Sequence, residues 1–383
     1  MSETEIPEPD RIEGAPHPRA TAQVIGQTQA QAAFLQAFNS GRLHHGWLIT
    51  GARGVGKATL AWQIARFLLA TPMGGGDDMF GGPPAPTTLD IAPDHPVMRR
   101  TLALSEPGLF LLRQGGAGST ESEREKNLRD GKFAADIRVD EVRKLAHFFQ
   151  LSAVEGGRRV VIVDAADEMT VQAANALLKM LEEPPANTTL LLVCHQPTRL
   201  LPTIRSRCRE LRLSPLSAAD MGQALEQAGI AMPGDPHGLA ELAAGSVGEA
   251  VRLINLGGLQ MYQELVGLYS TLPRLDRARA LKMAETAAAR GADTRLDLLI
   301  SLNDMLMVRL ARTGALGHPP SVEAVPGEAT LLTRLAPDPM KARAWADTAQ
   351  QIGARMQHGR AVNLDPTALI LDTVFKIQQT AAG

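Results

Sequence analysis

The sequence predicts an α/β domain built on a parallel five-stranded sheet, followed by a small helical domain and a larger all-α domain. In the first 213 residues, apolar strand-like runs alternate with helical patterns, and this alternation favours a parallel sheet covered by helices on both faces. After Pro215 the strand signals stop and helical periodicity continues alone. The length of 383 residues agrees with two or three domains, at about 150 residues per domain.

The composition is that of an ordinary globular protein. Hydrophobic residues make up 44% of the chain and charged residues 21%, so a sizeable core can form without a disulfide or metal staple. Because the 39 basic and 41 acidic residues nearly cancel, any contact with DNA must come from a local patch or from partner proteins. Aromatic residues amount to only 4%, which disfavours base-stacking modules.

Cysteine content and hydropathy predict the compartment. Cys194 and Cys208 are the only two cysteines, so a disulfide framework and a four-thiolate zinc site are both excluded, and the chain fits a reducing compartment. The first 20 residues contain no apolar run, and no stretch of about 18 apolar residues occurs elsewhere, so we expect neither a signal peptide nor a membrane span. The sequence therefore predicts a cytoplasmic protein with no membrane partner.

The first predicted elements surround a short buried strand. Residues 1–20 combine charge with proline and predict a disordered tail. A helix is predicted over 27–40, where alanine and phenylalanine recur at helical spacing. The apolar run at 46–50 ends in glycines and predicts a buried strand, and a second helical pattern starts after Lys57.

Two polar segments interrupt the alternation further along the chain. Residues 72–96 are rich in Gly, Pro and Asp and predict an irregular insertion, whereas 115–133 is charged and Gly/Ser-rich and predicts a mobile loop. A helix is expected from Asp140 to Gln150. The remaining strand candidates are 109–112, 160–163, 190–193 and 210–213.

Caps and prolines predict the helix boundaries and the domain limits. Thr170 is expected to cap a helix that ends at Glu183, before two prolines. Ser217 and Asp220 are expected to open the first helix of the small helical domain. The predicted segments are a disordered tail at 1–20, the α/β domain at 21–213, the small helical domain at 214–257 and the larger helical domain at 258–383.

The segment between the first strand and the next helix matches the pattern G-x-x-x-x-G-K. It reads Gly51-Ala52-Arg53-Gly54-Val55-Gly56-Lys57. In such loops, glycine amides wrap a phosphate, the helix N-terminus adds positive potential and the lysine reaches the terminal phosphates. We therefore predict a nucleotide site formed by Gly51, Gly54, Gly56 and Lys57; the alternative is a glycine-rich turn without a ligand.

Two residues that catalysis would need are missing from this site. Where a Ser or Thr hydroxyl should coordinate Mg²⁺ the chain has Ala58, and Thr59 is turned away by about 100° along the helix. Asp164 follows the third strand and could hold Mg²⁺ through water or merely cap a loop, but Ala165 stands where an acid should activate water. We therefore expect phosphate binding without metal-assisted hydrolysis, and no metal site.

Five segments of the chain carry a family signature. They are Val24-Ile25-Gly26-Gln27, His44-His45-Gly46-Trp47-Leu48, the phosphate loop, Ala174-Asn175-Ala176-Leu177-Leu178-Lys179-Met180-Leu181-Glu182-Glu183-Pro184-Pro185 and Ser206-Arg207-Cys208. Together they resemble the bacterial clamp-loader subunits of the AAA+ superfamily, over residues 20–256. The resemblance implies an AAA+ P-loop domain, a helical lid at 214–257 and a C-terminal helical collar that serves oligomerisation.

The resemblance also implies a subunit that does not hydrolyse ATP. Active members have the Mg²⁺ hydroxyl and the catalytic acid that Ala58 and Ala165 replace. They carry an Arg three residues after a Gly-Ser pair of the lid, whereas Gly245-Ser246 is followed here by Val247-Gly248. No cofactor is then required, although nucleotide could stay bound without hydrolysis. The family's cysteine-rich zinc knuckle would fall within 72–100, where this chain has no Cys, so we predict no zinc.

In similar proteins the arginine of the Ser-Arg-Cys motif enters the nucleotide site of a neighbouring subunit. On this basis Arg207, flanked by Ser206 and Cys208, is the catalytic candidate, because its planar guanidinium would meet the γ-phosphate in trans. The alternative is a surface arginine that pairs with a nearby acid such as Glu210.

The partners implied by the resemblance are the tau/gamma and delta clamp-loader subunits, the beta sliding clamp and primed DNA held by the assembled complex. The chain would then belong to the DNA-directed DNA polymerase holoenzyme of the cytoplasmic replisome, without a carboxylate pair of its own for two-metal polymerisation. One alternative is an active AAA+ ATPase of the tau/gamma type, which needs the two missing residues. The other is a P-loop nucleotide kinase, which leaves the Ser-Arg-Cys segment and the collar unexplained.

Overall fold

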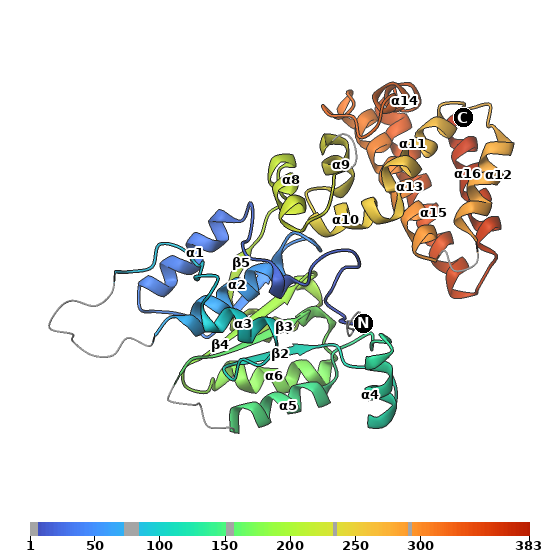
Figure 1. Ribbon diagram of the computed structural model, residues 1–383. Coiled ribbons are helices and arrows are strands. Elements are labelled where there is room, and N and C mark those ends of the chain that lie inside the picture. The colour runs from blue at the N-terminus through green and yellow to red at the C-terminus, as the bar shows by residue number, and fades with distance from the viewer. Residues whose placement is uncertain (1–6, 73–83, 151–156, 233–235, 290–292) are drawn as a thin grey trace, which may run out of the picture. The chain divides into compact units, whose positions relative to one another are not determined.

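The computed structural model describes residues 7–72, 84–150, 157–232, 236–289 and 293–383 (Figure 1). It divides into two compact units, each treated separately below. The first unit holds the chain up to Ile230 together with Ser246–Gly248, and the second holds Ala231–Gly245 and Glu249–Gly383. The boundary between the units therefore falls inside the segment predicted as a lid, 214–257.

The first unit contains a five-stranded sheet in the order β2-β3-β4-β1-β5, and every pairing within it is parallel. Its strands are β1 (Gly46–Thr50), β2 (Leu109–Arg113), β3 (Arg159–Asp164), β4 (Thr188–Cys194) and β5 (Arg209–Arg212). All five predicted strands are confirmed. Because the strands are parallel, their carboxyl ends share one edge of the sheet and their amino ends share the opposite edge.

The helices of the first unit include those predicted at 27–40, after Lys57, from Asp140 to Gln150 and up to Glu183. They are α1 (Thr28–Asn39), α2 (Lys57–Ala70), α3 (Pro96–Leu102), α4 (Glu121–Arg129), α5 (Val139–Gln150), α6 (Val171–Glu182), α7 (Pro202–Arg205) and α8 (Ala218–Gln227). The hydroxyl of Thr170 accepts from the Ala173 amide at the start of α6, and that of Ser217 accepts from the Asp220 amide at the start of α8. Both predicted caps are confirmed.

Helices cover both faces of this sheet (Figure 1). On one face, Leu48, Val161 and Leu190 of the strands lie in a buried cluster with Leu145 of α5 and Leu177 of α6. On the other face, α2 packs against β3 and β4. The strands are thus apolar on both sides, which is why they are continuous hydrophobic runs in the sequence.

The prediction of a disordered tail is wrong for residues 7–20. His17 in this segment is only 5% exposed, and Pro18–Ala20 forms a 3₁₀ turn. Arg113 at the end of β2 holds Glu8 and Asp10, with its Nη1 at 3.0 and 2.5 Å from their carboxylate oxygens. These long-range ion pairs order a segment whose composition alone predicts disorder. Residues 1–6 lie outside the described part of the chain.

The prediction of a mobile loop at 115–133 is also wrong, because this segment contains the helix α4. The Thr120 hydroxyl caps α4 by accepting from the Glu123 amide, and a bridge between Gly116 and Phe133 closes the segment at its base. The other polar segment agrees with its prediction as far as it is described, since residues 84–95 form no helix or strand. The part at 73–83 lies outside the described residues.

Helices are the only regular elements in the described residues of the second unit. Its helices are α9 (Pro236–Ala243), α10 (Val247–Leu256), α11 (Gly258–Tyr269), α12 (Arg277–Ala287), α13 (Asp293–Leu316), α14 (Glu328–Leu335), α15 (Pro339–Ala361) and α16 (Pro366–Ala382). The long helices α13 and α15 pack against each other, and α16 packs against α12 and α15. In the described parts of both units, no helix is long and apolar enough to span a bilayer.

A buried ionic network ties four elements of the second unit together. Glu328, at the start of α14, is 0% exposed, and its Oε1 accepts from the Tyr262 hydroxyl of α11 at 2.5 Å. Its Oε2 accepts from the Ala324 amide at 2.7 Å and from Nη2 of Arg309 of α13 at 3.1 Å. Arg309 also pairs with Glu241 of α9 at 3.1 Å.

Candidate nucleotide site and arginine face

The predicted phosphate loop joins the carboxyl end of β1 to the N-terminus of α2. Gly51, Gly54 and Gly56 have φ angles of 145°, 78° and 100°, a region that side chains with a Cβ rarely adopt. The structure therefore brings these glycines together with Lys57 at one edge of the sheet, in a loop whose shape requires glycine.

Lys57 is bonded to its own loop. The side chain is buried, and its Nζ donates to the carbonyl oxygens of Gly51 at 2.8 Å and Ala52 at 2.6 Å. Burial lowers the pKa of Lys57 to about 8, although the charges of Asp164 and Asp167 act in the opposite direction. The ammonium that would bind phosphate is thus already satisfied by carbonyl groups.

A turn at 246–248 closes over the same loop. The Ser246 hydroxyl donates to the Arg53 carbonyl at 2.8 Å, and the Gly248 amide donates to the Gly54 carbonyl at 3.1 Å.

The side chain of Gln27, for which the sequence predicts no role of its own, also supports the loop. Gln27 donates through its Nε2 to the Val55 carbonyl at 3.2 Å and to the carbonyl of Ser214 at 2.8 Å.

We expect Gly54→Ala to destabilise the first unit by about 2 kcal/mol or more. A Cβ at this position would lie 2.4 Å from the Ser246 hydroxyl oxygen and 2.9 Å from the Gly248 backbone. The 246–248 turn must then move, so the Gly248 amide should exchange faster with deuterium. Gly41→Ala is the matched control, because Gly41 has a similar φ of 68° but no atom within 4 Å. Equal loss of stability in thermal unfolding of the two variants would contradict the steric argument.

Asp164 and Ala165 end β3 beside this loop. Burial and the negative charge of Asp10 raise the pKa of Asp164 to about 7, while Lys57 acts in the opposite direction. The raised pKa means that burial disfavours the charged form of this carboxyl group. The methyl group of Ala165 offers no base, and that of Ala58 at the start of α2 offers no oxygen to a metal.

Asp167 and His195 connect the ends of β3 and β4. The two carboxylate oxygens of Asp167 accept from the backbone amides of His195 at 3.0 Å and Gln196 at 2.9 Å. Burial alone would raise the pKa of Asp167, but these amide hydrogen bonds lower it. Burial and the nearby charge of Lys57 lower the pKa of His195 to about 4. Both oxygens of Asp167 are therefore engaged in holding the backbone.

Arg207 lies at the opposite edge of the sheet from the phosphate loop. It precedes β5, and the amino end of β5 is in register with the amino end of β1, with Arg209 beside Trp47. Its Nη1 donates to the Thr203 carbonyl at 3.0 Å, and its Nη2 lies 2.8 Å from a carboxylate oxygen of Glu182. This ion pair is open to solvent, since the two side chains are 36% and 49% exposed.

The two residues that flank Arg207, Ser206 and Cys208, make contacts within the fold. The Ser206 hydroxyl donates to the Thr203 carbonyl at 3.1 Å, so it fixes the turn that carries Arg207. Cys208 is half-buried against the core, and burial raises its pKa to about 12. A thiol with this pKa is protonated at neutral pH and is inert as a nucleophile. Glu210, which the sequence offered as an alternative partner for Arg207, instead accepts a hydrogen bond from the Thr50 hydroxyl at 2.6 Å.

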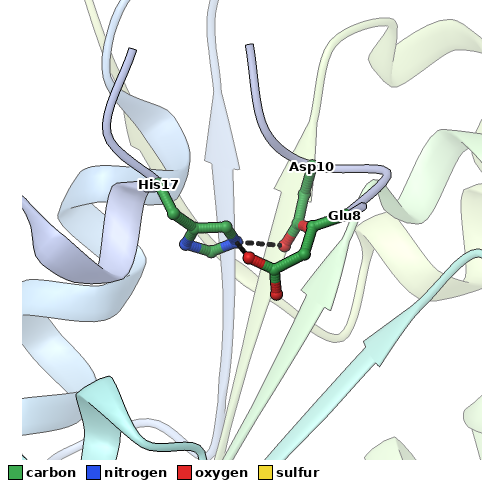
Figure 2. Close-up of side chains that lie close together, drawn as sticks. All are labelled: Glu8, Asp10 and His17. Atoms are coloured by element: carbon green, nitrogen blue, oxygen red, sulfur yellow. Dashed lines mark ion pairs between the residues drawn. The ribbon is translucent and has the colours of Figure 1, made fainter. Parts of the chain in front are cut away.

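Glu8, Asp10 and His17 form a cluster of possible metal ligands in the N-terminal segment, with all ligand atoms within 4.8 Å of one another (Figure 2). Nδ1 of His17 accepts from the Arg19 amide at 3.0 Å, so the proton of the neutral ring lies on Nε2. Nε2 lies 3.1 Å from Oδ2 of Asp10, although the two atoms do not meet the geometry of a hydrogen bond. A metal would need the Nε2 lone pair, and Arg113 already balances the carboxylates. This arrangement does not fit a divalent cation.

Comparison with known proteins finds several sequences that are similar to this chain. Residues 99–217 match the sequence family described as "DNA polymerase III, delta subunit". The delta-prime subunit of DNA polymerase III from Pseudomonas aeruginosa is 36% identical over 229 residues, which make up 60% of this chain and 60% of that protein. The chain is thus similar in sequence to subunits of DNA polymerase III. The predicted fold class, an α/β domain with a parallel five-stranded sheet followed by helical regions, is confirmed by the structure.

Two further relatives come from the same group of proteins. The delta-prime subunit of Bacillus subtilis is 29% identical over 59% of this chain and 59% of its own length. The tau subunit of Escherichia coli is 27% identical over 79% of this chain but only 46% of its own length. The chain thus spans about three fifths of the length of the delta-prime relatives that it matches, and less than half of tau.

Proposed function

We propose that this chain is a non-hydrolysing, delta-prime-type subunit of a clamp loader. In this role it assembles with tau/gamma and delta subunits, helps to place the beta sliding clamp on primed DNA, and donates Arg207 to the nucleotide site of a neighbouring subunit. The similarity to delta-prime and tau subunits supports the membership of such a complex. Two features of the first unit support the finer part of the proposal: the position of Arg207 and the residues of the chain's own phosphate loop.

The position of Arg207 is the observation that carries the proposal. The phosphate loop follows the carboxyl end of β1, whereas Arg207 lies beside its amino end. The five residues of β1 separate the two edges by about 16 Å, at about 3.3 Å per residue. Arg207 therefore cannot reach the loop of its own chain, and its exposed guanidinium is available to a site on another chain.

The chain's own loop supports the other half of the proposal. Lys57 is bonded to loop carbonyls, Asp164 has a raised pKa, and Ala58 and Ala165 provide neither a Mg²⁺ hydroxyl nor a base. The alternative is an active ATPase of the tau/gamma type, which the similarity to tau would allow. It requires that another side chain, such as Thr59, replaces the missing hydroxyl.

The proposal predicts that the purified chain does not hydrolyse ATP, with or without Mg²⁺. When the chain is added to tau/gamma, delta, clamp and primed DNA, clamp loading and ATP turnover should rise, because the chain completes a site on a neighbour. Phosphate release measures turnover, and a mixture that lacks only this chain is the reference. Mg²⁺-dependent hydrolysis by the chain alone would favour the tau/gamma-type alternative.

A further inference from the structure

We propose that residues 8–19 form a strap that closes the chain's own nucleotide site and keeps nucleoside triphosphates out of the phosphate loop. The absence of hydrolysis needs only Ala58 and Ala165, so a barrier to binding goes beyond the proposed function. It is also independent of Arg207, which lies at the other edge of the sheet. Three sets of contacts hold the strap in place.

The first set fixes the start of the strap to the loop's edge of the sheet. Arg113 is the last residue of β2 and is in register with Asp164 of β3. Its Nη1 lies 3.0 Å from Glu8 and 2.5 Å from Asp10. Glu8 also pairs with Arg19 at 2.6 Å, which links the two ends of the strap. The two carboxylates are therefore placed at the edge where nucleotide phosphates would lie.

The second contact brings the middle of the strap to the phosphate loop. A Cβ built at Gly248 would lie 2.7 Å from Cδ1 of Ile12 and 2.9 Å from Cα of Gly54. Ile12 and Gly54 thus both pack against the turn whose amide is bonded to the Gly54 carbonyl. The middle of the strap therefore lies against the turn that is bonded to the phosphate loop.

The third set fixes the end of the strap to α2, the helix that begins at the loop. His17 packs edge-on against Trp62 with ring centroids 6.0 Å apart. The buried guanidinium of Arg66 donates to the Arg19 carbonyl at 2.8 Å and to the Thr21 carbonyl at 2.9 Å. Because α2 carries both these residues and Lys57, the strap cannot lift without breaking contacts to the helix of the loop.

Charge explains why the strap opposes a polyphosphate. Burial alone would raise the pKa values of Glu8 and Asp10. Arg19, His17 and Arg113 lower the pKa of Glu8, and His17 and Arg113 lower that of Asp10, so the charged forms are favoured. A triphosphate would have to displace these two acids from Arg19 and Arg113. Lys57, the lysine of the loop, is engaged with carbonyl groups. Binding therefore requires that the strap leaves.

Binding of a fluorescent ATP analogue to the full chain tests the strap. Glu8→Gln with Asp10→Asn removes its charges, and Asp140→Asn with Glu141→Gln is the matched control, because these acids form exposed ion pairs on α5. We call the Glu8→Gln, Asp10→Asn chain the release variant, and we expect it to bind the ATP analogue at least tenfold more tightly than both the wild type and the control. Adding Lys57→Ala to the release variant should abolish the gain, which places the nucleotide in the loop.

Two more variants separate strap release from loss of charge. Arg113→Ala loosens the strap while it removes a positive charge, and Ile12→Ala loosens it with no change in charge; both should tighten binding. Circular dichroism and thermal unfolding verify that each variant is folded, and Ile12→Ala, at a 40% exposed position, preserves every ion pair of the strap. The proposal is overturned if the folded release variant binds the analogue no more tightly than the wild type. It is also overturned if only the release variant binds more tightly, whereas Arg113→Ala and Ile12→Ala bind as the wild type does.

Discussion

Arg207→Ala is expected to slow ATP hydrolysis at the neighbouring site of the reconstituted loader by about 10³-fold or more, since an arginine supplied in trans stabilises the charge of the transferring phosphate by this amount. Its ion pair with Glu182 is exposed and contributes only about 0–1 kcal/mol to stability. The guanidinium can therefore leave Glu182 at little cost, and its removal should leave the fold and the assembly intact.

The measurement is phosphate release by the complete loader with clamp and primed DNA. Arg205→Ala is the matched control, because Arg205 is an exposed arginine at the end of α7, two residues away. Arg207→Lys keeps the charge but loses the planar fork, so it should recover little of the rate. Because only one site of the loader is affected, total ATP turnover should fall by the contribution of that site alone. Turnover equal to that of the wild type in both Arg207 variants would show that the residue is a surface arginine.

Glu328→Ala is expected to lower the free energy of unfolding of the second unit by about 3–5 kcal/mol, because Arg309 loses its buried carboxylate partner and keeps only the partly exposed Glu241. Arg309 would lose the carboxylate that lies 2.6 Å from its Nε. The Tyr262 hydroxyl and the Ala324 amide would lose their acceptor at the same time, each at a cost of about 1–3 kcal/mol if left unpaired.

Urea denaturation followed by the near-ultraviolet signal of tyrosine reports on this unit. The chain has two tyrosines, and Tyr262 and Tyr269 both belong to α11. Glu323→Ala is the matched control, since Glu323 is an exposed acid of the same loop that accepts one amide hydrogen bond; we expect it to cost about 1 kcal/mol or less. If both substitutions shift the midpoint equally, the network does not stabilise the unit.

The sheet was predictable because its strands are buried on both faces. The run at 160–163, for example, is the centre of β3, and the charged residues Arg159 and Asp164 only extend it. A strand covered by helices on both sides needs apolar residues at every position, and such runs are visible in any sequence. The phosphate loop was predictable for a related reason, since its glycines must occupy positive φ angles.

The strap was not predictable, because its anchors lie far apart in the sequence. Glu8 and Asp10 pair with Arg113, 105 and 103 residues away, and composition cannot reveal such partners. The helix α4 is different, since Thr120 and Glu123 form the start of a capping box that could have predicted it. The charged, glycine-rich surroundings obscured that signal. The supporting role of Gln27 depends on the position of Ser214 after β5, which only the fold provides.

The hydrogen bonds of Lys57 and the strap have a consequence for thermal stability. A ligand that binds only the folded state makes a protein more stable as its concentration rises. Here Lys57 is bonded to the carbonyl groups of Gly51 and Ala52, and the proposed strap closes the loop. The melting temperature of the chain should therefore not follow the concentration of ATP.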